Sequence, residues 1–219
     1  MLFRSIKVLI RNYRMQNDRI AKSWHNLHDA GVTAVDNPGL PIEVKDYKGV
    51  AYLHSGGVLW CKLPSGRLMA YAQPSVVIES QDSLVWEDGT VEDADTYLPA
   101  DIDFFVSSGL ATLVERKPRP QVRFWGKVGG SWMPKRLYGG LSCENICQAG
   151  CRDFQADAIL DLEAAGYPVV MHTHDDVAAE VPEGFGSEEE FGEIMARPRA
   201  WAPGMPLAVK TWSGTRYGD

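Results

Sequence analysis

The 219-residue chain lacks several features that define whole classes of protein. No stretch approaches the ~18 consecutive apolar residues that a membrane-spanning helix needs, so no membrane association is expected. Four cysteines in a chain of this length do not make a disulfide framework, which favours a reducing, cytoplasmic location. The apolar stretch at the N-terminus carries basic residues throughout, unlike a secretory signal peptide. We therefore expect a globular cytoplasmic protein with one large domain or two small ones.

Charges of one sign are also absent from two long stretches. The net charge is -7, from 22 Lys and Arg and 29 Asp and Glu. Between Arg67 and Arg116 there is no Lys, Arg or His, whereas acidic residues are scattered over segment 79–103. Their spacing is not that of a calcium-binding loop, so this segment is predicted to be a solvated insertion and not a metal site.

The following segment, 116–143, contains no Asp or Glu but combines basic residues with aromatic ones. Lys and Arg neutralise phosphates and aromatic rings stack on bases, so this composition favours nucleic-acid binding. The alternative is a solvated loop whose aromatic side chains pack inward. The residues predicted to contact DNA here are Arg123, Lys127, Lys135 and Arg136.

Hydrophobic periodicity predicts an α+β fold in three segments. Apolar residues at three- and four-residue steps predict a helix over 5–30, within a helical segment 1–45. Segment 46–137 is predicted to be β-rich, with strands near 57–63 and 67–72 joined by a Pro-Ser-Gly turn.

The third segment, 138–219, has the best-defined pattern. It predicts a long helix over 142–165 that ends at Gly166, because glycine often terminates helices. Strands over 168–173 and 177–181 follow, with a tight turn at 174–176. A helix over 188–196 opens with Ser187 and Glu190, which have the spacing of a capping box.

The long helix is predicted to have two faces. Its apolar stripe consists of Cys147, Cys151, Phe154, Ala158 and Leu162, and its polar stripe of Glu144, Gln148, Arg152 and Gln155. Cys143, Cys147 and Cys151 are spaced four apart, but one helix rarely offers three thiolates to a single ion. We therefore predict core packing, and not metal binding, for these cysteines.

The turn at His174-Asp175-Asp176 is the sharpest local signal. Adjacent carboxylates repel unless a cation compensates them, and hard divalent ions prefer oxygen ligands. Aspartate is also common in ordinary turns, which is the simpler interpretation. A third interpretation is a zinc-dependent hydrolase that uses His172, His174 and Asp175.

Several separate blocks follow one another along the chain. They are Arg136–Gly140, Glu144–Ile146, Gln148–Ala149, Arg152–Asp153 and 164–184, then Gly186–Ser187, Glu189–Phe191, Ala200–Gly204, Pro206–Leu207, Trp212 and Tyr217. Together they resemble the C-terminal palm and tail of family A DNA polymerases, of the DNA polymerase I type, in their phage-encoded branch. Leu63–Arg67 and the helix that carries Trp24 are similar to the segment just after the nucleotide-binding helix of the fingers in that family.

The resemblance implies roles for individual residues. Asp175 corresponds to a carboxylate that binds the catalytic Mg2+ ions, and His174 to a histidine near the primer terminus. Asp176 stands where glutamate is usual, so its reach is shorter. Gln148, with Arg152 beside it on the polar stripe, corresponds to the helix face that contacts primer–template DNA. Deoxynucleoside triphosphates are the implied second substrate.

The chain departs from this family in one respect that matters for activity. The other catalytic Asp and the nucleotide-binding helix belong to motifs that are not found in these 219 residues. We therefore expect a partial palm, with a fingers-side helix and a β-rich insertion, that is inactive alone. An upstream polymerase half would complete it, unless the chain is the remnant of a decayed polymerase or a piece of a longer one. The alternatives are a non-catalytic duplex-DNA-binding module and the zinc hydrolase described above.

Overall fold

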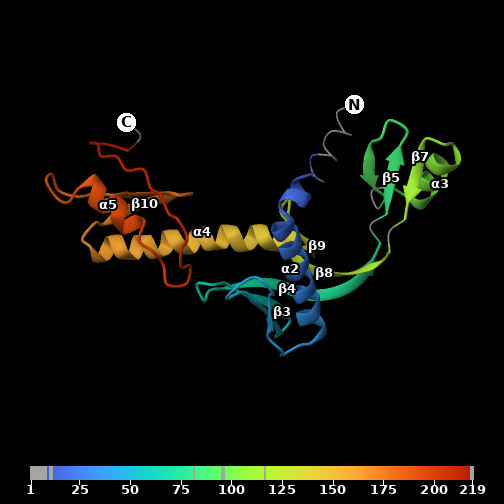
Figure 1. Ribbon diagram of the computed structural model, residues 1–219, viewed down its shortest axis with the longest axis horizontal. Coiled ribbons are helices and arrows are strands. Elements are labelled where there is room, and N and C mark those ends of the chain that lie inside the picture. The colour runs from blue at the N-terminus through green and yellow to red at the C-terminus, as the bar shows by residue number, and fades with distance from the viewer. Residues whose placement is uncertain (1–8, 10–11, 81, 95–96, 116, 218–219) are drawn as a thin grey trace. The chain divides into compact units, whose positions relative to one another are not determined.

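The computed structural model describes residues 9, 12–80, 82–94, 97–115 and 117–217 (Figure 1). The fold is α+β with antiparallel sheets, as the sequence predicts. The chain divides into two compact units, of which unit 1 takes Met1–Cys61 and Met69–Cys143 and unit 2 takes Lys62–Leu68 and Glu144–Asp219. The division into 1–45, 46–137 and 138–219 stays a prediction. In the described part of the chain, no helix has the length and apolar character needed to cross a membrane.

Helix α2 (Asp18–Asp36) forms one layer of unit 1. The helix predicted to end at residue 30 continues to Asp36, so that prediction was wrong at its C-terminal end; residues 5–8, 10 and 11 lie outside the described residues. Gly31 lies inside the helix and against the sheet, where an added Cβ would be 3.9 Å from Val122 Cγ2. The helix ends where the Asn37 backbone N–H and side chain both donate to the Thr33 carbonyl.

A six-stranded antiparallel sheet forms the second layer of unit 1. The strand order is β1 (Ile42–Glu43), β2 (Ala51–Ser55), β3 (Val58–Lys62), β4 (Leu68–Glu79), β8 (Arg119–Val128) and β9 (Ser131–Leu137). Helix α2 packs against β2 and β8, and Leu27, Tyr52 and Val122 are among the side chains buried there. The predicted β3–β4 hairpin is confirmed, with Leu63 N–H bonded to the Arg67 carbonyl at 2.8 Å across its turn.

The acidic segment between β4 and β8 contains a small three-stranded sheet and a helix. The sheet has the order β6 (Val91–Asp93), β5 (Ser83–Trp86), β7 (Ala111–Val114), and α3 (Pro99–Ser107) begins at a proline, which suits the first turn of a helix. Leu84 and Ala111 are buried in its own core, and Trp86 packs against them. This core and α3 were not predicted, because the sequence pattern indicated strands alone.

Helix α4 (Gly139–Ala164) matches the predicted long helix but begins three residues earlier. Gly139 opens it because a side chain would not fit there: an added Cβ would lie 1.8 Å from the Trp24 carbonyl oxygen of α2. The predicted end at Gly166 is confirmed, since this residue has φ +89° and its N–H bonds the Glu163 carbonyl.

The hairpin of β10 (Val169–Thr173) and β11 (Asp176–Ala179) and helix α5 (Glu188–Met195) follow as predicted. Leu162, Tyr167 and Ile194 form the buried core beneath them. The predicted capping by Ser187 is confirmed, because its Oγ accepts from the Glu190 N–H at 3.1 Å. The second contact of a capping box, between the Glu190 carboxylate and the Ser187 N–H, runs through another side chain.

The Tyr167 hydroxyl stands between the two residues of this cap. It accepts from the Ser187 N–H at 3.2 Å and donates to Glu190 Oε2 at 2.7 Å. The hydrogen bond to the carboxylate raises the pKa of Tyr167. The start of α5 is thus bonded to Tyr167, three residues after the end of α4.

Candidate functional site

The His-Asp-Asp turn is a two-residue loop at the tip of the β10–β11 hairpin. Thr173 pairs with Asp176 in the last position of the ladder, so His174 and Asp175 form the loop itself. His174 has φ +49°, a left-handed conformation that a two-residue hairpin loop commonly needs and that glycine usually supplies. The backbone of a histidine in this conformation is strained, and strained residues are often found at functional sites.

The two aspartates of the turn have different surroundings. Both are exposed. The Asp176 carbonyl accepts from Gln155 Nε2 of α4 at 3.2 Å, and its carboxylate accepts from the Tyr217 hydroxyl at 3.4 Å. Within residues 12–80, 82–94, 97–115 and 117–217, no hydrogen bond or ion pair engages the Asp175 carboxylate. Asp175 is therefore the one with its oxygens open to a ligand.

The polar stripe of α4 is partly exposed and partly used inside the protein. Gln148 and Arg152 are exposed, and Gln148 donates to Glu144 at 3.2 Å. Gln155 is buried and accepts from Arg152 while it donates to the Asp176 carbonyl. Gln155 therefore connects Arg152 to the hairpin turn, a role that the stripe pattern did not reveal.

The predicted apolar stripe of α4 is only half correct. Ala158 and Leu162 are buried, but Cys147 and Cys151 are exposed, so the prediction of core packing was wrong for these two thiols. The hydrophobic cluster of unit 2 covers the C-terminal turns of the helix, through Leu162, and does not include the cysteines. Cys143 is half-buried and accepts from the Tyr47 hydroxyl at 3.4 Å.

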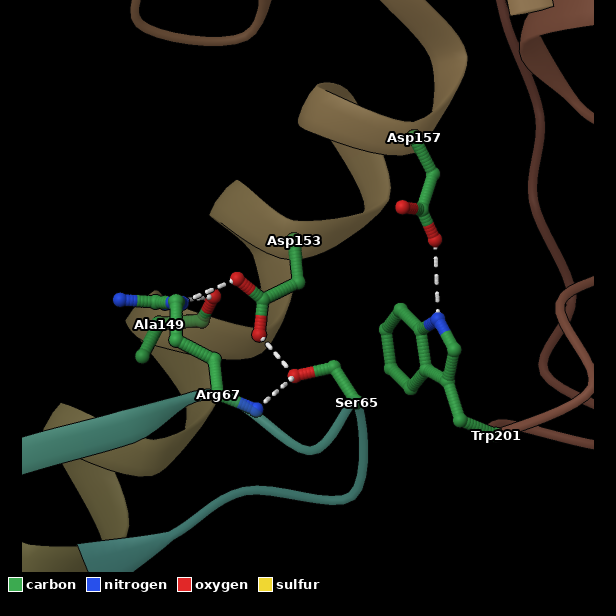
Figure 2. Close-up of polar contacts among 6 residues, drawn as sticks. All are labelled: Ser65, Arg67, Ala149, Asp153, Asp157 and Trp201. Carbon is green, nitrogen blue, oxygen red and sulfur yellow. Dashed lines mark hydrogen bonds and ion pairs between the residues drawn. The ribbon is translucent and has the colours of Figure 1, made fainter. Parts of the chain in front are cut away.

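A carboxylate on α4 holds the turn between β3 and β4, as Figure 2 shows. Asp153 Oδ1 binds Arg67 Nε at 2.5 Å, and its Oδ2 accepts from the Ser65 hydroxyl at 2.5 Å. Arg67 Nη2 also donates to the Ala149 carbonyl at 2.9 Å. Sequence reasoning did not assign a role to Asp153 or Arg67 beyond the matching blocks in which they occur. Helical spacing gave no signal, because the partners are 86 residues apart.

Two further aspartates on α4 hold the C-terminal tail. Asp157 accepts from Trp201 Nε1 at 2.9 Å (Figure 2), and Asp161 binds Arg199 Nη1 at 2.6 Å. The Trp201 ring packs against Phe154, with centroids 4.3 Å apart. Asp153, Asp157 and Asp161 recur every four residues, so one side of the helix carries all three attachments.

The β8–β9 hairpin divides the predicted DNA-binding residues between two faces. Arg123 pairs with Arg136 and Lys127 with Trp132, which places these side chains on one face of the sheet. Lys135 pairs with Phe124 on the other face, where Lys135 Nζ lies 5.7 Å from the Phe124 ring. Of the aromatic residues, Phe124 is buried, as the inward-packing alternative expects, whereas Trp125, Trp132 and Tyr138 are exposed.

Two of the predicted DNA-binding arginines already have an acidic partner. Glu79 Oε1 accepts from Arg123 Nε at 2.6 Å, and Glu79 Oε2 lies 2.8 Å from Arg136 Nε. The Glu79 side chain is mostly buried and both arginines are half-exposed. Glu79 therefore offsets part of the positive charge of this face.

The side chains of the β10–β11 turn suit Mg2+ better than zinc. Zinc sites are built from three or four protein ligands, and within the described residues no group of three His, Cys, Asp or Glu side chains is close enough to hold an ion. Mg2+ binds oxygen ligands and commonly takes only one or two protein carboxylates, with water and substrate phosphates completing its shell. The exposed Asp175 carboxylate fits one such position.

Comparison with known proteins relates the chain to a DNA polymerase. It is 30% identical over 202 residues to the DNA polymerase of Bacillus phage SP02, which covers 92% of this chain and 25% of that polymerase. The chain thus spans about a quarter of the length of the curated relative it matches. No protein-family model and no solved structure matches. The similarity supports a relationship to DNA polymerases.

Proposed function

We propose that this chain is the C-terminal palm part of a family A DNA polymerase, which adds deoxynucleotides to a primer 3′ end under the direction of a template. The similarity to the phage DNA polymerase, over 92% of the chain, carries the proposal. The resemblance of the separate blocks to the palm supports the choice of family. DNA and nucleotides are the substrates that follow from it.

In this proposal the hairpin turn forms part of the catalytic site. Asp175 binds Mg2+, which when bound would stabilise the charge that develops on the transferred phosphoryl group. His174 lies beside the primer terminus, fixed by its place in the two-residue loop. Asp176 has a supporting role, because its backbone is bonded to Gln155 and its carboxylate to Tyr217.

The site needs a second carboxylate, which we assign to polypeptide outside these 219 residues. The edge of β10 that faces away from β11 is consistent with a neighbour there. Within the described residues β10 pairs with β11 alone, so its other edge has no strand beside it there. A two-stranded sheet is marginal by itself, so an additional strand would stabilise it. Without that strand we expect no polymerase activity.

The exposed strip of α4, formed by Gln148 and Arg152 of the polar stripe, is proposed to contact primer–template DNA. Gln148 presents an amide, and Arg152 is oriented by its bond to Gln155. Arg67 is held beside this strip by Asp153 and Ala149, and its side chain remains 45% exposed. A partly exposed guanidinium with a fixed orientation is suited to a phosphate contact.

Primer extension by the completed enzyme tests the proposal. The chain would be combined with an upstream polymerase half, and single-turnover incorporation would be measured on saturating primer–template. Asp175→Asn keeps the size of the side chain but removes its charge, so incorporation should be nearly lost while DNA binding survives. Asp176→Asn is the matched control and should cost much less. Gln148→Ala should weaken DNA binding more than incorporation.

Three outcomes would count against the proposal. If Asp176→Asn abolished incorporation while Asp175→Asn did not, the assignment of the turn would be wrong by one residue. If the isolated chain extended a primer with Mg2+, the second carboxylate would not be missing. A completed enzyme that binds duplex DNA but never extends a primer would favour the non-catalytic DNA-binding module.

A further inference from the structure

The β8–β9 hairpin exposes two tryptophans on one face. Trp125 is 38% exposed and Trp132 is 58% exposed. Trp125 is paired with Pro134, and Trp132 with Lys127, so the two indoles are diagonal neighbours on the same face. Diagonal neighbours in an antiparallel pair lie roughly 7–8 Å apart, close enough to form one continuous aromatic surface.

Positive charge surrounds these indoles. By the register of β4, β8 and β9, Arg119, Arg123, Lys127 and Arg136 belong to the same face, against the single acid Glu79. This surplus is found in a chain whose net charge is -7. A cationic surface that carries adjacent aromatic rings fits a polyanion with exposed π-faces.

The chemistry favours single-stranded over duplex DNA. Bases in a duplex are already stacked and paired, whereas unpaired bases can stack on aromatic side chains. A protein strand added to the edge of the sheet is a poorer fit, because β9 is the edge strand and its Pro134 has no N–H to donate.

We infer that the Trp125–Trp132 face of the β8–β9 hairpin binds single-stranded DNA. Unpaired bases stack on the two indoles, and Lys127 with the neighbouring arginines contacts the phosphates. The inference rests on the proposed function for the choice of DNA as the nucleic acid, since an uncopied template is single-stranded. None of the residues of this face belongs to the β10–β11 turn or to α4.

Fluorescence anisotropy with the full chain tests the inference, with a labelled oligothymidylate and a duplex of equal length as probes. Trp132→Leu and Trp125→Leu keep apolar bulk but remove the aromatic face, so each should weaken oligothymidylate binding roughly 5- to 100-fold. Trp132→Phe should keep most of the affinity. Met133→Leu, at an exposed position on the opposite face of the same hairpin, is the matched control and should change nothing.

The outcomes separate this inference from the proposed function. The inference would be overturned if the leucine variants lost equal affinity for oligothymidylate and for the duplex. It would also be overturned if both leucine variants bound oligothymidylate as tightly as the wild-type chain. Failure of the wild-type chain to bind oligothymidylate would also overturn it. Primer extension that depends on Asp175 would stand in each of these cases. Conversely, a stacking surface that discriminates leucine from phenylalanine would stand even if no completed enzyme extended a primer.

Discussion

Asp153 on α4 and Arg67 in the β3–β4 turn form an ion pair in which Arg67 Nε lies 2.5 Å from Asp153 Oδ1. The carboxylate is 9% exposed and the guanidinium 45%. Because Ser65 donates to the other carboxylate oxygen, a single side chain of α4 fixes both ends of the Ser65–Arg67 turn. Because the carboxylate is largely buried, removing one partner of this pair should cost more than removing one partner of a surface ion pair.

Replacement of Asp153 should therefore destabilise the chain more than replacement of a neighbouring helix aspartate. Asp153→Ala removes hydrogen bonds from a hydroxyl and a guanidinium and should lower the free energy of unfolding by about 2–3 kcal/mol. Asp157→Ala removes one bond from the Trp201 indole and should cost about 1 kcal/mol. Urea unfolding of both variants checks this order. Equal losses would mean that the Arg67 pair adds nothing to stability.

The local parts of this site could be predicted from the sequence, and the long-range parts could not. The strand–turn–strand around Asp175 and the helix end at Gly166 depend on neighbouring residues, so their patterns were sufficient. The attachment of Arg67 to Asp153 depends on how distant segments pack, and no periodicity encodes it. The same limit explains why Cys147 was expected in the core: its helix position is apolar in pattern but has no hydrophobic neighbour cluster.

Helix α4 provides a second test, because Gly139 at its start and Gly150 in its interior have opposite surroundings. Gly139→Ala would put a Cβ 1.8 Å from the Trp24 carbonyl oxygen, so the backbones must separate and stability should fall by about 2–3 kcal/mol. Gly150 has no atom within 4 Å of an added Cβ. Gly150→Ala should therefore raise stability by about 0.5–1 kcal/mol through its higher helix propensity. Thermal unfolding of both variants measures the contrast, and a tolerated Gly139→Ala would contradict the close approach of α2.

The buried thiol of Cys61 predicts a loss of stability at alkaline pH. Burial raises the pKa of Cys61 to about 12, whereas in the unfolded chain the thiol ionises with a pKa near its ordinary value of 9.0. Between these values the unfolded state binds fewer protons than the folded state, so stability falls as pH rises. The contribution of this thiol is fully present below pH ~9 and is lost toward pH ~12, by up to about 1.4 kcal/mol per pH unit.

Urea unfolding at a series of pH values from ~8 upward checks this dependence. Cys61→Ala should be less stable at neutral pH because it leaves a cavity, but its stability should fall less steeply with pH. The exposed Cys151 is the control, and Cys151→Ala should keep the wild-type slope. Burial also raises the pKa of Tyr52, so some slope should remain at higher pH in every variant. A Cys61→Ala chain with the wild-type slope would contradict the assignment.

The faces of the β8–β9 hairpin show a further limit of the sequence. The composition of segment 116–143 indicated DNA contacts, but strand register decides that Lys135 lies opposite Phe124 and away from Lys127. A shift of one residue in the register would exchange the two faces. The acid that neutralises Arg123 comes from β4, outside the acid-free segment, so its influence could not be read from that segment alone.

Glu79 therefore gives the last prediction, in which stability and DNA affinity change in opposite directions. Glu79→Gln removes the carboxylate shared by Arg123 and Arg136, so two guanidiniums lose a mostly buried partner and stability should fall by about 1–3 kcal/mol. The same change releases both guanidiniums toward solvent. Affinity for oligothymidylate should rise, and the slope of log affinity against log salt should steepen by roughly one phosphate contact.

Titrations at several salt concentrations separate this effect from a general change of charge. Glu43→Gln removes the same charge from β1, at the opposite edge of the six-stranded sheet, and should leave the salt slope unchanged. Lys127→Ala should lower the slope, since it removes a cation that faces the same way as Trp132. If Glu79→Gln destabilises the chain yet leaves both affinity and slope unchanged, the arginines hold the sheet together and do not contact phosphates. An increase for Glu79→Gln alone would instead mean that this carboxylate limits the affinity of the face for DNA.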